Sequence, residues 1–175
     1  KLEGTPYTAE TLAGTDFNVQ AENISYDPDI EQLVRKIARG HMSKDVSISG
    51  KRRVKITFRV HVHAGAAAAT PPDYGKCLKA CAMKETVHGS TGVSYVPHSG
   101  YTNVPATIEI VEKDEGASPS QLVVKARGCM GTAKFNMDAV GQPVSIDFEF
   151  NGVLVSIADR AFGSILTPTG FDTVL

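Results

Sequence analysis

The sequence ARGCMGTAKFNMDAVGQPVSIDFEFNG, residues 126–152, decides the fold class of this chain. Its two halves alternate between apolar and polar side chains, a period of two that is typical of half-buried β-strands. The apolar set consists of Ala133, Phe135, Met137, Val144, Ile146, Phe148 and Phe150. Gly141 and Pro143 interrupt the pattern, as expected for a turn. We therefore expect a β-hairpin that buries the apolar set and leaves the polar side chains in solvent.

The polar set of this hairpin carries both charges. It includes Lys134, Asp138, Asp147 and Glu149. Asp147 and Glu149 are two residues apart, so they point to the same side of a strand, as the two carboxylates of a hydrolytic site would. Solvated strand faces show the same pattern, and the chain contains no GxSxG, HExxH or P-loop motif. We interpret this face as an assembly surface and do not expect an enzyme.

A second alternating segment, residues 51–63, is the clearest single strand of the chain. Its apolar face consists of Val54, Ile56, Phe58, Val60 and Val62. At ~3.3 Å per residue, residues 53–63 reach roughly 36 Å, whereas a typical strand has only about 5–6 residues. We expect this strand to cross the whole domain.

Shorter segments predict the remaining elements. Strands are expected at residues 17–24, 93–97, 106–112, 121–126, 131–138, 144–151 and 153–158. Residues 26–29 (YDPD) predict a turn, because Pro28 restricts the preceding residue to extended geometry. Residues 30–39 fit both helical and strand spacing, and we favour the strand. Residues 73–83 predict a short helix, since Pro72 suits its start.

The spacing of these segments predicts one mainly β domain, a β-sandwich or barrel-like fold with one short flanking α-helix. A chain of 175 residues suits a single domain. We divide it into an N-terminal arm (residues 1–16), a β-domain (residues 17–160) and a C-terminal segment (residues 161–175). The β-domain includes a long, exposed loop at residues 38–50.

The composition excludes several classes of protein. Charged residues make up 21% of the chain and the formal net charge is -1, so no global charge drives it toward nucleic acid or an anionic membrane. No apolar run reaches the ~18 residues of a membrane span, and we expect no membrane anchoring. The three cysteines, an odd number, argue against a disulfide framework and fit a reducing compartment.

Two small groups resemble metal or redox sites. His61 and His63 are two apart on the long strand and so share a face, as a pair of metal ligands would. Cys77 and Cys81 are four apart on the expected helix, which suits half of a zinc site or a redox pair. Polar surface histidines and small core cysteines explain both patterns as well, and the cysteines lack CxxC spacing. We favour these readings and expect no metal and no cofactor.

The long strand also carries a dense basic run. It consists of Lys51, Arg52, Arg53, Lys55 and Arg59. A nucleic-acid patch would interleave such residues with exposed aromatic side chains, but the nearby Phe58 belongs to the apolar face. Acidic strand faces elsewhere in the chain offer partners for these cations, so we expect subunit contacts.

The chain resembles the major tail tube proteins of long-tailed, siphovirus-type bacteriophages and prophages. The matching segments, in chain order, are FNVQAENISYDP, SGKRRVKITFRVHVHAG, PPDYGKCLKACAMKET, VSYVP, NVPATIEIVEKDEG and ARGCMGTAKFNMDAVGQPVSIDFEFNGV. The last contains a spaced pattern formed by Gly128, Gly131, Phe135, Gly141, Phe148, Phe150 and Gly152. The order of the segments is the more specific signal, since each motif alone is weak.

The resemblance implies a structural virion protein whose hexameric rings stack into a hollow tube for genome delivery. Implied partners are copies of the chain itself, tape measure, tail terminator and tail tip proteins, and DNA that passes without sequence-specific binding. The implied location is the virion tail, assembled in the bacterial cytoplasm. The alternatives are a tail terminator, head–tail joining or decoration protein, and a ligand-binding β-sandwich.

The resemblance also suggests roles for particular residues. An acidic lumen would suit Asp138, Asp147 and Glu149, and Lys134 lies on the same expected face. Residues 1–16 and the loop at 38–50 become candidates for ring stacking. Candidates for subunit or ring contacts are Arg39, His41, Lys44, Asp45, Arg52, Arg53, Lys55 and Arg59.

Overall fold

The computed structural model describes residues 1–16, 19–33, 48–65, 67–99, 104–113, 121–137, 141 and 143–160. Most of the expected long loop and the whole C-terminal segment lie outside these residues.

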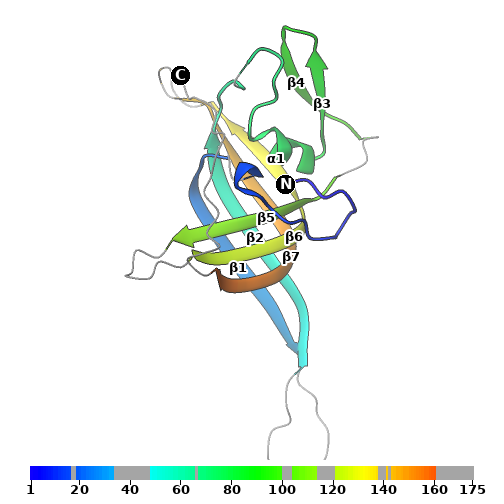
Figure 1. Ribbon diagram of the computed structural model, residues 1–175, viewed down its shortest axis with the longest axis vertical. Helices are drawn as coiled ribbons and strands as arrows, with labels where there is room; N and C mark the ends of the chain where they lie inside the picture. The colour runs from blue at the N-terminus through cyan, green and yellow to red at the C-terminus, as the bar shows by residue number, and fades with distance from the viewer. Residues whose placement is uncertain are drawn as a thin grey trace, which may run out of the picture.

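An antiparallel five-stranded sheet with the order β1-β2-β7-β6-β5 forms the body of the protein (Figure 1). Its strands are β1 (Ala21–Leu33), β2 (Ile48–His61), β5 (Ala106–Lys113), β6 (Gln121–Asn136) and β7 (Ser145–Arg160). A separate hairpin consists of β3 (Met83–His88) and β4 (Gly92–Pro97). The described residues also form the helix α1 (Gly75–Ala80) and a 3-10 turn, η1 (Gly14–Asp16). The predicted mainly β class with one short helix is confirmed.

The two longest strands each join segments that the sequence predicted as separate strands. Residues 121–126 and 131–138 belong mostly to β6, and residues 144–151 and 153–158 belong mostly to β7. In β6 the register shifts between Arg127 and Met130, and Gly128 has a positive φ of 61°. A bulge therefore replaces the expected break, because glycine adopts this backbone conformation without strain.

The predicted turn at residues 26–29 is wrong, because these residues lie inside β1. Pro28 pairs with Val54 of β2 in an unbroken register from Ser25 to Ile30. Since β1 is the edge strand of the sheet, a residue without an N–H group is tolerated there.

The predicted helix at residues 73–83 is too long. α1 ends at Ala80, and Met83 already begins β3, which the sequence analysis missed. Apolar positions on this short helix and on the strand that follows it are close enough in sequence to imitate one continuous helical face.

The five-stranded sheet is staggered into two parts. In the four-stranded part, residues 21–29 of β1, 53–61 of β2, 145–153 of β7 and 130–136 of β6 lie side by side. Pairing of β2 with β7 ends at Arg53 and Val153, and pairing of β5 with β6 ends at Ala106 and Cys129. Beyond these points residues 154–160 of β7 continue with β6 and β5 as a three-stranded part, while β1 and β2 project together (Figure 1).

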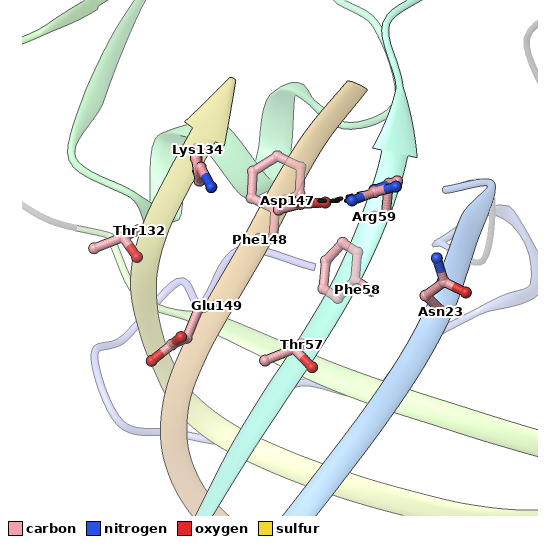
Figure 2. Close-up of a pocket in the computed structure, with 9 residues that line it drawn as sticks. All are labelled: Asn23, Thr57, Phe58, Arg59, Thr132, Lys134, Asp147, Phe148 and Glu149. Atoms are coloured by element: carbon pink, nitrogen blue, oxygen red, sulfur yellow. Dashed lines mark hydrogen bonds and ion pairs between the residues drawn. The ribbon is translucent and has the colours of Figure 1, made fainter. Parts of the chain in front are cut away.

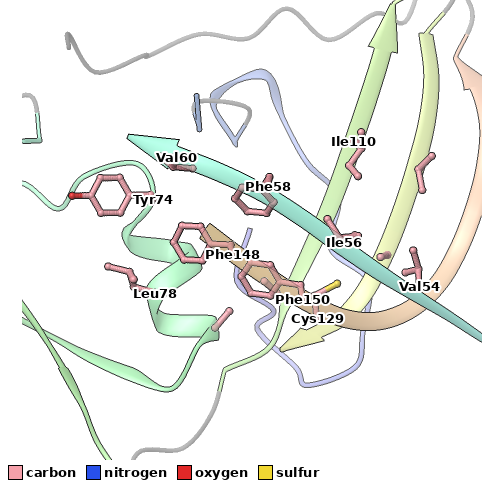
Figure 3. Close-up of a cluster of buried hydrophobic side chains, with 14 of the residues drawn as sticks. Val54, Ile56, Phe58, Val60, Tyr74, Leu78, Ile110, Cys129, Phe148 and Phe150 are labelled. Atoms are coloured by element: carbon pink, nitrogen blue, oxygen red, sulfur yellow. The ribbon is translucent and has the colours of Figure 1, made fainter. Parts of the chain in front are cut away.

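The main core lies on one face of the four-stranded part. Three phenylalanines, Phe58, Phe148 and Phe150, pack with ring centroids 5.3–5.9 Å apart. Tyr74 and Leu78, at the start of α1 and within it, cover this side (Figure 3). The predicted burial of the even-numbered side chains of β2 and β7 is thus confirmed from Val54 to Val60 and from Ile146 to Phe150.

Three members of the predicted apolar faces are exposed. The exposed fraction is 42% for Val62, 46% for Phe135 and 79% for Met137. Val62 directly follows β2, Phe135 lies near the end of β6, and Met137 directly follows β6. The prediction was wrong because alternation shows which side of the sheet a residue faces, but not where the covering layer ends.

The N-terminal residues pack against the body. Leu2 bridges Ala106 at the edge of β5, and the N–H of Glu3 donates to the carbonyl of Pro105 over 2.9 Å. Buried Glu3 accepts hydrogen bonds from the Gly128 N–H (2.7 Å) and the Thr107 hydroxyl (3.0 Å). Leu12 is also buried. Residues 1–3 therefore cover the first residues of the β5 edge.

Candidate assembly surface

The face of the four-stranded part opposite the core is strongly charged, and we call it the polar face. Its charged side chains are Glu22, Asp27 and Asp29 of β1, Arg53, Lys55 and Arg59 of β2, Asp147 and Glu149 of β7, and Lys134 of β6. They share this face because alternate residues of each strand point to the same side. Five carboxylates against four cations leave a formal charge of -1, so the face is nearly balanced.

One row of this face crosses all four strands with alternating charge, and we call it the charge row. Glu22 pairs in register with Arg59, Arg59 with Asp147, and Asp147 with Lys134. Directly opposed charges on neighbouring strands stabilise a sheet by about 0.2–1 kcal/mol per pair. The opposed charges of the charge row therefore favour this register and balance one another locally.

The contact between Arg59 and Asp147 is the best-defined contact of the charge row (Figure 2). Arg59 Nε donates to Asp147 Oδ1 over 2.6 Å, and Nη2 donates to Oδ2 over 3.2 Å, a two-pronged geometry. Asn136 Nδ2 also donates to Oδ2, over 2.6 Å. These hydrogen bonds, first from Arg59 and then from Asn136, lower the pKa of Asp147 from its ordinary value of 3.8.

Glu149 is neutralised by a different cation. Its Oε1 lies 2.9 Å from Lys55 Nζ, and both side chains are about half exposed. Exposed ion pairs of this kind contribute only about 0–1 kcal/mol each. The pairing mainly determines which charges the polar face offers to a partner, since Asp147 and Glu149 each already have a cation beside them.

The polar face is hollowed in two places. A depression of about 450 Å³ lies over the charge row and is lined by Asn23, Thr57, Phe58, Arg59, Thr132, Lys134, Asp147, Phe148 and Glu149 (Figure 2). A second, of about 500 Å³, lies toward the projecting end of β1 and β2 and includes Asp27, Asp29 and Arg53. Both hollows open on the polar face, and charged side chains from neighbouring strands contribute to the lining of each.

The structure brings together residues that the sequence analysis had assigned to different roles. Lys134, Asp147 and Glu149 were expected in a lumen, whereas Arg53, Lys55 and Arg59 were expected at subunit contacts. All six lie on the polar face. Arg52 points to the alternate side of β2, with Val54. The remaining candidates, Asp138, Arg39, His41, Lys44 and Asp45, lie outside the described residues.

Three acids of the edge strand β1 were not among the predicted site residues. Glu22, Asp27 and Asp29 all face the polar side, opposite Arg59, Lys55 and Arg53 respectively. The signal was present, because residues 21–33 contain four acids and no basic residue. It was hidden by the interpretation of residues 26–29 as a turn.

The histidines have local partners. His61 Nε2 lies 3.2 Å from Glu22 Oε2, and His63 Nδ1 lies 2.9 Å from the carbonyl oxygen of His61. The His63 ring also packs edge-on against Tyr74. Within the described ranges, no three His, Cys, Asp or Glu side chains gather closely enough to hold a metal ion.

The cysteines lie in or beside the core. Cys77 and Cys81 are half-buried against it, and Cys129 is fully buried. Burial raises the pKa of Cys77 to about 11 and that of Cys81 to about 12, so both thiols are protonated at neutral pH.

Comparisons with known proteins leave the function open. No helix among the described residues is long and apolar enough to cross a membrane. No family model, curated protein or solved structure matches this chain.

Proposed function

We propose that this protein is a structural subunit of a siphovirus-type tail tube, in which hexameric rings stack into a hollow conduit for DNA. The observation that carries the proposal is the four-stranded part, with a charged, hollowed face on one side and a packed core on the other. Such a sheet suits the inner wall of a tube, because it presents a continuous polar surface and its opposite face is packed against the hydrophobic core.

The two lateral strands of this element support assembly. The outer backbone groups of an edge strand must be paired, covered or guarded, and closure of a sheet into a barrel removes its edges altogether. Repeated head-to-tail contacts between copies form a ring when the rotation closes, and stacked rings form an open filament. A subunit with a net charge of -1 also adds little self-repulsion to a long polymer.

The charge balance of the polar face suits the passage of DNA. Protein cations that neutralise phosphates account for most non-specific affinity for DNA. Here Arg59 and Lys55 are held by Asp147 and Glu149, so fewer cations remain for phosphate groups. We therefore assign the polar face to the lumen, where DNA slides past a surface of nearly balanced charge.

Electron microscopy of the purified protein in negative stain tests this proposal, with the mass in solution measured by light scattering. We expect rings with sixfold symmetry and tubes of stacked rings at high protein concentration. Single rings that cap a tail end without stacking would favour a terminator or head–tail joining protein. Protein that stays monomeric at every concentration and salt would contradict the proposal.

Addition of tape measure, tail terminator or tail tip proteins extends the test. As subunit of such a tube, the chain would assemble in the bacterial cytoplasm around a tape measure protein and end in the virion tail. We expect these proteins to set the length of the tubes and to leave the geometry of each ring unchanged.

A further inference from the structure

The two lateral edges of the four-stranded part differ in charge. One edge is β1, and the other is residues 130–136 of β6, because β5 pairs with β6 only up to Cys129. Among the described residues, none pairs with the outer side of either edge. Charged side chains of residues 21–33 are all acidic, whereas Lys134 is the only charged residue among 130–136.

The charge row ends with opposite charges at these edges. Glu22 lies at the β1 end with 58% of its side chain exposed, and exposed Lys134 lies at the β6 end. A second copy placed beside the first, with its β1 next to residues 130–136, would continue the alternation without a break. Two like edges brought together would instead oppose charges of one sign, which destabilises a strand pair.

The core side of the same edges is also complementary. Phe135, at the β6 edge, has an exposed fraction of 46%, and Ile24, at the β1 edge, has one of 50%. Ile24 lines a mostly apolar cavity of about 310 Å³, together with Phe58 and Ile110. A bulge between Glu22 and Ser25 leaves Ile24 outside the β1–β2 register. Phe135 of one copy can therefore pack on Ile24 of the next.

We infer that residues 130–135 pair antiparallel with residues 21–27 of a second copy, with Lys134 opposite Glu22 and Phe135 on the same side of the sheet as Ile24, close enough to contact it. The pairing stops at Pro28, which has no N–H group to donate. The interface is heterologous, because the two edges differ, and so it repeats in one direction. This inference rests on the proposed assembly function and specifies the edges that meet within a ring.

Charge reversal tests the pairing. We expect Lys134→Glu alone, and Glu22→Lys alone, to raise the concentration needed for ring formation by about tenfold or more, because like charges then meet at every contact. The double variant should recover assembly. An equimolar mixture of the two single variants should also assemble, because alternating copies restore opposite charges at each contact. Urea unfolding of each variant establishes that it is folded.

Two controls define the contact. Lys84→Glu changes an exposed lysine on the β3–β4 hairpin and should leave assembly unchanged. Asp27→Lys should not rescue Lys134→Glu, since Asp27 lies in a different row, opposite Lys55. Phe135→Asn removes the apolar contact without reversing a charge and should also weaken assembly, which tests the edge even if a charge variant fails to fold.

The outcomes separate this inference from the proposed function. Normal rings from Lys134→Glu, or rescue by Asp27→Lys but not by Glu22→Lys, would overturn the pairing while the tube proposal stands. If the native protein forms only small oligomers that follow the charge-reversal pattern, the pairing stands and the tube proposal fails. A native protein that is monomeric at all concentrations would overturn both.

Discussion

At the scale of single residues, hydrogen bonds determine the charge of Asp147. Three donors on two side chains, those of Arg59 and Asn136, satisfy its two oxygens. A carboxylate that accepts these bonds stays ionised to lower pH than an ordinary aspartate, because protonation would weaken them. The polar face should therefore keep this part of its charge pattern to a lower pH than a free aspartate would.

Replacement of Asp147 by Asn gives a pH-dependent prediction. The pKa of Asp147 is lowered by folding, so its charge stabilises the folded state above pH 3.8, and this contribution is lost as pH falls through the lower folded pKa. We expect the free energy of unfolding at pH 7 to be larger for the native protein than for Asp147→Asn. This difference between the two proteins should shrink below pH 3.8. Urea titrations across this range measure it, and a difference that grew on acidification would contradict the assignment.

Gly131 illustrates a residue fixed by close approach of the backbone. A Cβ atom at this position would overlap the carbonyl oxygen of Glu149 and lie 2.7 Å from the ring of Phe150. We expect Gly131→Ala to destabilise the protein by about 1–3 kcal/mol, since the neighbouring strand must move. Gly92→Ala is the control, because nothing lies within 4 Å of its Cβ position. Equal urea midpoints for the two variants would refute this account.

At the scale of elements, periodicity predicted the strands well and their ends poorly. The alternation in β2 and β7 follows directly from burial on one side of a sheet, so residues 54–60 and 146–150 were predicted correctly. Gly128, Gly152 and Pro28 looked like breaks, yet the strands continue through all three. A glycine or proline marks an irregular backbone position, and only the neighbouring strands decide whether it is a turn, a bulge or an edge.

The β3–β4 hairpin depends on α1 for its position. Tyr95 donates to Glu85 Oε2 over 2.7 Å, and Glu85 Oε1 lies 3.4 Å from Lys79 of the helix. Burial and the Glu85 carboxylate together raise the pKa of Tyr95, so the hydroxyl keeps its proton. A two-stranded hairpin alone is only marginally stable in water, so this chain of contacts anchors it.

Tyr95→Phe should loosen the hairpin selectively. Loss of the hydroxyl leaves one Glu85 oxygen without its donor, at a cost of about 1–3 kcal/mol if that oxygen stays buried. We expect faster amide hydrogen exchange in residues 83–97 and unchanged exchange in β2 and β7. Ser94→Ala, which removes the exposed 2.7 Å contact with His88, is the matched control. Equal exchange in both variants would show that the Glu85 contact has no anchoring role.

At the scale of the whole molecule, residues 1–16 contribute to the folded body. Their contacts with Thr107 and Gly128 span more than 100 positions of the chain. These residues were predicted to form an arm because they show no sustained period, and the family resemblance alone made them candidates for ring stacking. Polar segments that pair with a strand edge leave no periodic signal, since backbone groups make the contacts.

Leu12→Ala measures how strongly this segment is coupled to the body. Leu12 is buried, and truncation of a buried leucine costs about 2–5 kcal/mol. We expect Leu12→Ala to unfold in a single transition that is shifted to lower urea concentration. Thr11→Ala, which changes the exposed neighbouring residue, should unfold at nearly the same urea concentration as the native protein. An unchanged transition for Leu12→Ala would mean that the segment folds independently of the sheet.

The polar face could be predicted only in part. The spacing of Asp147, Glu149 and Lys134 placed them on one side of a hairpin, and that of Arg53, Lys55 and Arg59 on one side of a strand. The two groups share one surface because β2 pairs with β7, and this pairing joins residues about 90 positions apart. The alternation within each strand does not reveal which strand will be its neighbour. The charge row is a property of this long-range register.

The staggered sheet has a mechanical consequence. β6 and β7 are each 16 residues long and antiparallel over almost their whole length. A force that slides β6 past β7, parallel to the strands, loads all of the hydrogen bonds between them at the same time. No single hydrogen bond then carries the whole force. The β3–β4 hairpin, pulled from its open end, would instead lose its bonds one after another. The same molecule thus combines a stiff element with one that peels away under small loads.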